Sequence, residues 1–120
     1  MIVGKGVFDG SGGHLMRGSF SIEQSASGLL FMTSDNFYFD GSPAPGFAFS
    51  ASGDPTQEEA TSTDFLRLPG TGALSGEQLE VIGRQSGPVP GSIDVSAQKL
   101  VFLWCYRVPF LLCIGEIEII

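Results

Sequence analysis

Two cysteines are the residues of this chain best suited to redox or nucleophilic chemistry. Cys105 lies inside the apolar and aromatic run 99–110, and Cys113 follows in the next apolar stretch. A thiol in such surroundings is either inert packing or an enclosed reactive group, because an apolar shell raises its pKa whereas a nearby guanidinium lowers it. Arg107 is the candidate guanidinium, since it would lie about 7 Å along a strand from Cys105.

The run around Cys105 is typical of a β-strand covered on both faces. A two-residue period places alternate side chains on opposite faces of this strand. One face would carry Val101, Leu103, Cys105 and Arg107, and the other would carry Phe102, Trp104, Tyr106 and Val108. If the strand continues, Cys113 lies about 27 Å from Cys105, out of bonding range. A hairpin centred near Pro109 would instead place the cysteines opposite each other. The alternation over 108–114 favours the continuous strand, so we predict that the two cysteines are not bonded to each other.

Other standard chemistries find little support in the sequence. His14 is the single histidine, so no multi-histidine zinc or copper site exists within the chain, and no metal site is predicted. By composition, a lone histidine is more often a surface or capping residue than a ligand. No nucleophile elbow, phosphate loop or dinucleotide fingerprint occurs in the required context. The glycine-rich segment 10–13 precedes an expected strand, so it lacks the helix N-terminus that a phosphate would use.

Length and charge limit the classes of partner. The chain has 120 residues and an apolar fraction of 42%, which fits one globular domain. Its net charge of -7 argues against nucleic acid and against an anionic membrane surface. The run 99–110 is too short for a membrane span, which needs roughly 18 to 20 apolar residues. Residues 1–8 do not resemble a signal peptide, so either a cytosolic protein or a domain of a longer secreted or membrane-attached precursor is expected.

Turn-forming segments rich in Gly, Pro, Asp and Ser recur roughly every 8 to 14 residues, and short apolar or alternating segments separate them. We therefore predict an all-β fold, a single antiparallel β-sandwich or flattened β-barrel of about eight to ten short strands over residues 1–120. Only Asp54 followed by Pro55 indicates a helical start, and it predicts at most one exposed turn. The predicted core is Phe20, Ile22, Leu30, Phe37, Phe47, Phe49, Leu66, Leu79, Val81, Val101, Leu103, Trp104, Phe110 and Leu112.

Several segments, taken in order, resemble the DM-thirteen domain family, which is associated with DOMON domains, Skeletor-type animal proteins and plant cytochrome b-type membrane reductases. The specific part is the Trp-Cys step at 104–105, preceded by Pro-Gly-Ser-Ile-Asp at 90–94. Residues 6–8 and 14–18 resemble the opening strand and the histidine step of the family. Residues 40–45 are similar to its Asp-Gly-Pro segment, with Ser42 inserted, and 66–69 with 76–81 match more loosely. The matching pieces run almost the length of the chain.

The resemblance implies an extracytoplasmic all-β domain, which would be periplasmic, secreted or on the cell surface. It also implies a hallmark cysteine at Cys105, which has been proposed as a redox centre for the family. His14 matches the position of the family's histidine. Cys113 stands where the family usually has a glycine, so it is either a resolving partner or filler. A redox or electron-transfer accessory domain is therefore expected, more than a stand-alone enzyme.

In this reading Cys105 carries the chemistry. His14 and Arg107 are candidate neighbours that tune the thiol, and Trp104 and Tyr106 could relay an electron or shield it. The resemblance implies a redox partner domain. Ligand spacing indicates neither haem nor metal, so the cofactor stays unknown.

Two other functions stay open. The first is a non-catalytic cell-surface binding module in which the loop with Asp40, Gly41 and Pro43 recognises a glycan or a protein. This alternative predicts an inert Cys105 and an exposed aromatic patch. The second is an interaction domain whose exposed aromatic residues form a homo-oligomer interface.

Overall fold

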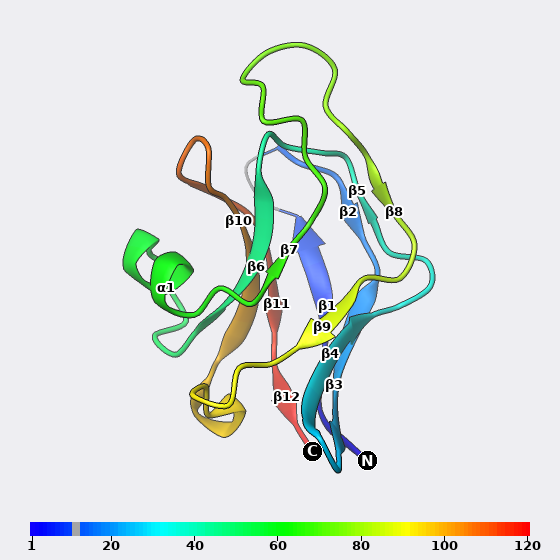
Figure 1. Cartoon of the computed structure of the whole chain (residues 1–120), viewed down its shortest axis with the longest axis vertical. Coiled ribbons are helices and arrows are strands. Elements are labelled where there is room, and N and C mark those ends of the chain that lie inside the picture. The colour runs from blue at the N-terminus through cyan, green and yellow to red at the C-terminus, as the bar shows by residue number, and fades with distance from the viewer. Residues whose placement is uncertain (11–12) are drawn as a thin grey trace.

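Twelve strands and two short helices make up the computed structural model, which describes residues 1–10 and 13–120 (Figure 1). The larger sheet contains β1 (Ile2–Gly10), β3 (Ser19–Ser25), β4 (Gly28–Thr33), β6 (Pro45–Ser50), β7 (Leu66–Arg67), β9 (Ser86–Pro88), β10 (Leu100–Cys105), β11 (Phe110–Glu116) and β12 (Glu118–Ile119). The smaller sheet contains β2 (Met16–Arg17), β5 (Tyr38–Phe39) and β8 (Val81–Ile82). The helices are α1 (Gln57–Ser62) and the 3-10 turn η1 (Val95–Ala97).

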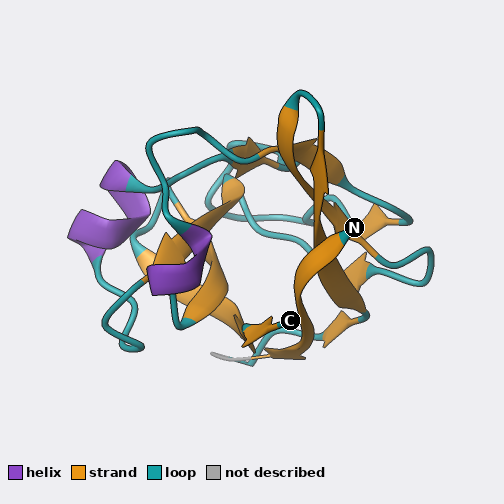
Figure 2. Cartoon of the chain, turned by 90° about the horizontal axis from the view of Figure 1, so that it is seen from below, coloured by secondary structure: helices purple, strands orange, loops and turns teal. Residues whose placement is uncertain are grey.

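The larger sheet is antiparallel and nearly closed. Its strands follow the order β7-β6-β10-β11-β1-β3-β4-β9, and β12 pairs with β1. The edge strands β7 and β9 come together, because a Cβ placed on Gly87 would lie 3.0 Å from Leu66 Cδ1. Figure 2 shows the strands curving around a common axis. The predicted all-β sandwich or flattened barrel is confirmed. The strand number exceeds the prediction because two-residue strands have too little sequence to show a period.

Phenylalanine rings fill the inside of the curved sheet. The Phe8 ring lies 5.1 Å from Phe20 and 5.5 Å from Phe47, and Phe31 lies 5.2 Å from Phe47, between ring centroids. Strand alternation explains this placement, since β3 buries Phe20 and Ile22 and leaves Ser19 and Ser21 partly exposed.

Two predicted core residues are exposed instead. Leu30 is 36% exposed because its neighbour Phe31 takes the inward position on β4, so the two-residue period sends Leu30 outward. Leu79 is 47% exposed in the irregular segment before β8. At both positions the sequence pattern alone does not show which side chains face the core.

A second apolar cluster lies on the outer face of β6, β10 and β11, under α1 (Figure 1). It contains Phe102, Trp104 and Ala60 of α1. The helix begins two residues later than the predicted Asp54 cap. Thr56 is the N-cap, and its hydroxyl accepts the Glu59 N–H at 3.1 Å while the Glu59 carboxylate accepts the Thr56 N–H at 3.2 Å.

The stretch after Cys105 is a hairpin, so the predicted continuous strand is wrong. β10 and β11 pair antiparallel, with Cys105 opposite Phe110 and Leu103 opposite Cys113, and residues 106–109 turn the chain. Pro109 has no amide donor and therefore suits the turn better than a strand interior. The register places Cys113 opposite Leu103, two residues before Cys105, so the cysteines are not directly opposite each other. Both thiols are free, as predicted, but for a different geometric reason.

Within the described ranges, no helix has the length and apolar character needed to cross a membrane.

Candidate functional site

Cys105 lies at the end of β10, where two distant segments meet. Its strand neighbours are Phe110 on β11 and Pro45 on β6. The residue after it, Tyr106, donates its N–H to Ala44 O at 2.9 Å. These pairings hold the loop before β6 and the turn after β10 against the same side chain. The Cys105 side chain is fully buried among the inward-facing residues.

Opposing effects act on the Cys105 thiol. Burial removes water from the sulfur and raises its pKa. Backbone amides of Val108 and Ala44, the Ser42 hydroxyl and the Arg107 amide act in the other direction, because hydrogen bonds to a thiolate favour the charged form. The donors outweigh the burial, and the pKa of Cys105 lies below its ordinary value. Buried thiols in purely apolar surroundings shift the other way, so the neighbouring donors distinguish Cys105 from a packed thiol.

Ser42 is the donor that sequence reasoning missed. The side chain is 1% exposed and its hydroxyl has no hydrogen-bond partner among the described residues. It is also one of the groups that lower the pKa of Cys105. A buried hydroxyl without a partner costs about 1 to 3 kcal/mol. The only hint in the sequence was that Ser42 is the residue inserted in the segment resembling Asp-Gly-Pro.

The pKa of Cys113 shifts in the opposite direction from that of Cys105. Its side chain is fully buried, and it shares the inner core with Cys105. Burial is the largest influence and Asp9 adds to it, so the pKa of Cys113 rises far above its ordinary value despite the Leu103 amide. A thiol that stays protonated is a poor nucleophile, and Cys113 therefore behaves as packing.

His14 is held beside this site by Asp40. Its Nδ1 lies 2.8 Å from Asp40 Oδ1, and the second carboxylate oxygen accepts the Leu15 N–H at 3.0 Å. The imidazole also packs against Phe39 and Phe110, with ring centroids 5.5 Å and 5.8 Å away. Because Phe110 is the strand partner of Cys105, His14 is connected to the site through one ring and through the loop that follows Asp40.

Arg107 does not use its guanidinium at the thiol. The residue lies in the turn after β10 with an exposed side chain, so it does not share a strand face with Cys105 as predicted. Its backbone amide is the group that faces the sulfur. Arg107 therefore acts on the Cys105 thiol through its backbone amide, and the predicted effect of its guanidinium charge is absent.

Trp104 and Tyr106 lie on the outer side of β10, with the α1 cluster and away from the inward-facing thiol. The Tyr106 hydroxyl donates to Ala60 O at 2.6 Å, and the Arg67 guanidinium stacks 3.5 Å above its ring centroid. Burial raises the pKa of Tyr106 to about 12. These contacts anchor the outer cluster, and they do not connect either aromatic ring directly with the sulfur.

The loop with Asp40, Gly41 and Pro43 is occupied by internal contacts. Gly41 is buried with φ +110°, and a Cβ there would lie 2.6 Å from Leu79 O. Pro43 O accepts the Gly72 N–H at 2.7 Å. The expected free recognition surface is therefore not present at Gly41, and the loop instead supports Cys105 and His14.

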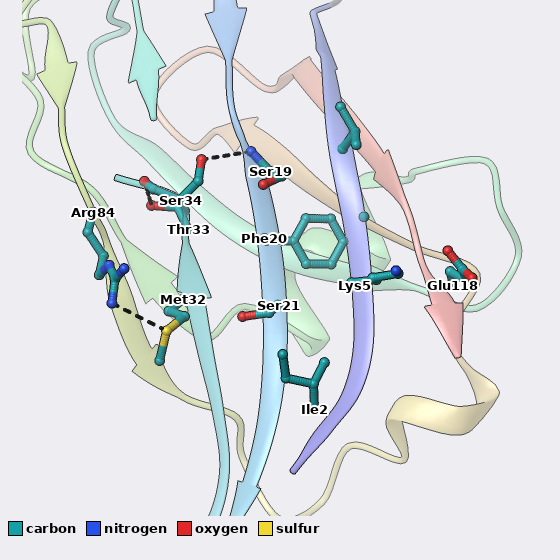
Figure 3. A pocket seen from close by; sticks show the side chains of 12 residues that line it. Ile2, Lys5, Ser19, Phe20, Ser21, Met32, Thr33, Ser34, Arg84 and Glu118 are labelled. Atoms are coloured by element: carbon teal, nitrogen blue, oxygen red, sulfur yellow. Dashed lines mark hydrogen bonds between the residues drawn. The ribbon is translucent and has the colours of Figure 1, made fainter. Parts of the chain in front are cut away.

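One surface groove shares no residue with the cysteine site. It has a volume of about 570 Å³ and lies on the outer face of β1, β3 and β4. Figure 3 shows Lys5, Ser21 and Met32 across its floor, with Arg84 at one side donating to the Met32 sulfur. Arg84 is already paired with Asp35 at 2.9 Å.

Across residues 1–10 and 13–120, no three His, Cys, Asp or Glu side chains come together as a metal site would require.

Comparisons with protein-family models, curated proteins and solved structures found no match.

Proposed function

We propose that this chain is a redox accessory domain whose centre is the Cys105 thiolate. The observation that carries the proposal is the contrast between two buried cysteines on paired strands. Groups of the turn 106–109 and the loop 42–44 lower the pKa of Cys105, whereas burial raises that of Cys113 in the same core. Packing alone would treat the two alike. A fold that stabilises one charged sulfur has a use for it.

The proposal agrees with what the resemblance to DM-thirteen domains implies for Cys105. In it, His14 and Asp40 are positioning residues, because they tether the loop that presents Ser42 and Ala44 to the sulfur. Cys113 has no chemical role.

The binding-module alternative and the oligomer alternative both expected exposed aromatic side chains. Every aromatic residue lies in the described ranges, and all of them are buried or partly buried. The structure offers these alternatives no aromatic patch, so the redox proposal has the more specific support.

The test is site-resolved alkylation of the native protein. Iodoacetamide at neutral pH, followed by peptide mass spectrometry, is expected to modify Cys105 and leave Cys113 intact. Cys105→Ser should abolish the labelling, and Cys113→Ser should leave it unchanged. Equal labelling of the two cysteines, or labelling of neither in the folded state, would contradict the proposal.

A further inference from the structure

The groove on the outer face of β1, β3 and β4 is hollow because its middle strand carries small side chains. Lys5 pairs across the sheet with Ser21, and Ser21 with Met32, so these three residues form one row over the floor (Figure 3). The next row pairs Val7 with Ser19. The serines of β3 therefore leave a depression of about 570 Å³, which is within the range of small-ligand sites.

Cationic side chains stand on both sides of this floor. Arg84 donates to the Met32 sulfur at 3.7 Å, and Asp35 accepts from its Nε at 2.9 Å, so the guanidinium is held at one side. Lys5 lies on the other side, two strand spacings or about 10 Å from Met32 across the sheet. The ion pairs found in the described part of the chain do not include Lys5. Two of the six basic residues of a chain with net charge -7 thus line one groove.

Ser21 lies between the two cations. Its hydroxyl points toward β4, and Figure 3 shows no hydrogen bond from it to the other residues of the groove. The Lys5 ammonium lies toward β12, and its flexible four-carbon stem can swing over Ser21 because no ion pair holds it. An anionic group above Ser21 would accept the hydroxyl proton in a hydrogen bond and lie between Lys5 and Arg84.

The rest of the groove offers apolar surface to a ligand. Val7 is 72% exposed and Ile2 is 45% exposed, and both line the groove together with the half-buried Met32. A hydrocarbon lying over these side chains would remove them from water, which is favourable in proportion to the apolar area covered. The groove therefore combines a position for one anionic group with an adjoining apolar surface.

We propose that this groove binds a small amphipathic carboxylate, with its carboxylate over Ser21 between Lys5 and Arg84 and its hydrocarbon chain over the exposed apolar side chains. Glu118 is the charge that opposes such a ligand, because it lines the groove and lies opposite Lys5 on β12. The site shares no residue with the Cys105 site, so its test is independent of the redox proposal.

The experiment is isothermal titration calorimetry of the full chain with decanoate below its micelle concentration. Decanoate should bind at least about tenfold more tightly than decyltrimethylammonium, which has the same chain and the opposite charge, or than acetate, which has only the carboxylate. Amide shifts in nuclear magnetic resonance spectra on adding decanoate should concentrate on β1, β3 and β4.

Charge variants test the two cations separately. Lys5→Gln and Arg84→Gln should each weaken decanoate binding about fivefold, which is the factor expected from one charge pair at the protein surface. Lys99→Gln removes an exposed lysine outside the groove and is the matched control, so its affinity should equal that of the unmodified protein. Glu118→Gln should bind decanoate more tightly, because it removes the opposing carboxylate.

A filled floor tests the groove itself. Ser21→Leu places a larger side chain at this partly exposed position and should abolish binding, with a thermal melt confirming that the variant is folded. If the variant does not fold, the charge variants decide. Equal binding of decanoate and decyltrimethylammonium, unchanged affinity in both Lys5→Gln and Arg84→Gln, or amide shifts centred outside the groove would each overturn the inference.

Discussion

Replacing Ser42 with alanine should make the protein more stable and its thiol less reactive. The hydroxyl is buried and has no hydrogen-bond partner among the described residues, so it costs folding free energy of about 1 to 3 kcal/mol. Alanine removes that cost and leaves a void smaller than a methyl group. We expect a gain of about 1 kcal/mol in the free energy of unfolding, which raises Tm by about 4 °C for a domain of this size.

The change in the free energy of unfolding caused by Ser42→Ala should depend on pH. Because the pKa of Cys105 is lower in the folded state, the thiolate contributes stability that is present above the unfolded value of roughly 8.5 and is lost as pH falls through the folded value. Ser42→Ala should therefore be more stable than the unmodified protein in mildly acidic buffer. At pH 9 the hydroxyl stabilises a thiolate, so the gain should shrink or reverse.

Urea unfolding followed by Trp104 fluorescence at pH 6 and pH 9 measures both effects, and iodoacetamide kinetics at neutral pH measure reactivity. The alkylation rate should fall about tenfold, because a hydrogen bond to a charged group is worth about 1.5 kcal/mol or more. Ser50→Ala is the matched control. Its hydroxyl donates to Glu59 Oε1 at 2.9 Å and accepts the Gly53 N–H at 3.1 Å, so its loss should destabilise by about 1 kcal/mol. Equal destabilisation by the two substitutions would refute the reasoning.

Three further perturbations test the fold around the site. Tyr106→Phe should lose about 1 kcal/mol at pH 7 with its bond to Ala60 O. The unmodified protein should lose up to about 2 kcal/mol between pH 10 and pH 12, because Tyr106 ionises more readily in the unfolded chain. Alkaline urea melts of Tyr106→Phe should show a smaller decline, the remainder coming from Tyr38, whose pKa is also raised. Gly6→Ala would place its Cβ against Glu116 O and 2.5 Å from the Phe20 ring, so calorimetry should show a loss of about 3 kcal/mol, and an unchanged Tm would contradict the packing. Asp40→Ala removes the bonds to His14 Nδ1 and the Leu15 N–H, so alkylation of Cys105 should slow as its loop loosens, whereas an unaltered rate would remove Asp40 and His14 from the site.

Much of the fold was already determined by local sequence patterns. Alternation over 18–23 predicts which side chains of β3 turn inward, because a strand sends neighbouring residues to opposite faces. Frequent glycine and proline divide the chain into short strands, which leaves an antiparallel sheet as the economical way to bury them. The same alternation predicts that Val101, Leu103 and Cys105 share one face, and all three belong to the inner core.

The hairpin after Cys105 was not determined by pattern. Alternation over 108–114 fits a continuous strand and a returning strand equally well, because the two-residue period holds in both directions along the chain. Only the pairing of β11 with both β10 and β1 selects the return. Because of this turn, Arg107 affects the Cys105 thiol through its backbone amide and not through its guanidinium.

The state of the cysteines was decided by tertiary structure alone. The sequence by itself determines that Cys105 is buried among apolar residues, and burial alone predicts an inert thiol with a raised pKa. The fold brings Ser42 and Ala44, distant in sequence, onto the same sulfur and reverses that shift, whereas Cys113 receives no comparable set of donors. Hydrogen bonds act over about 3 Å, so a thiol's reactivity depends on which remote segments the strand pairing brings within that distance.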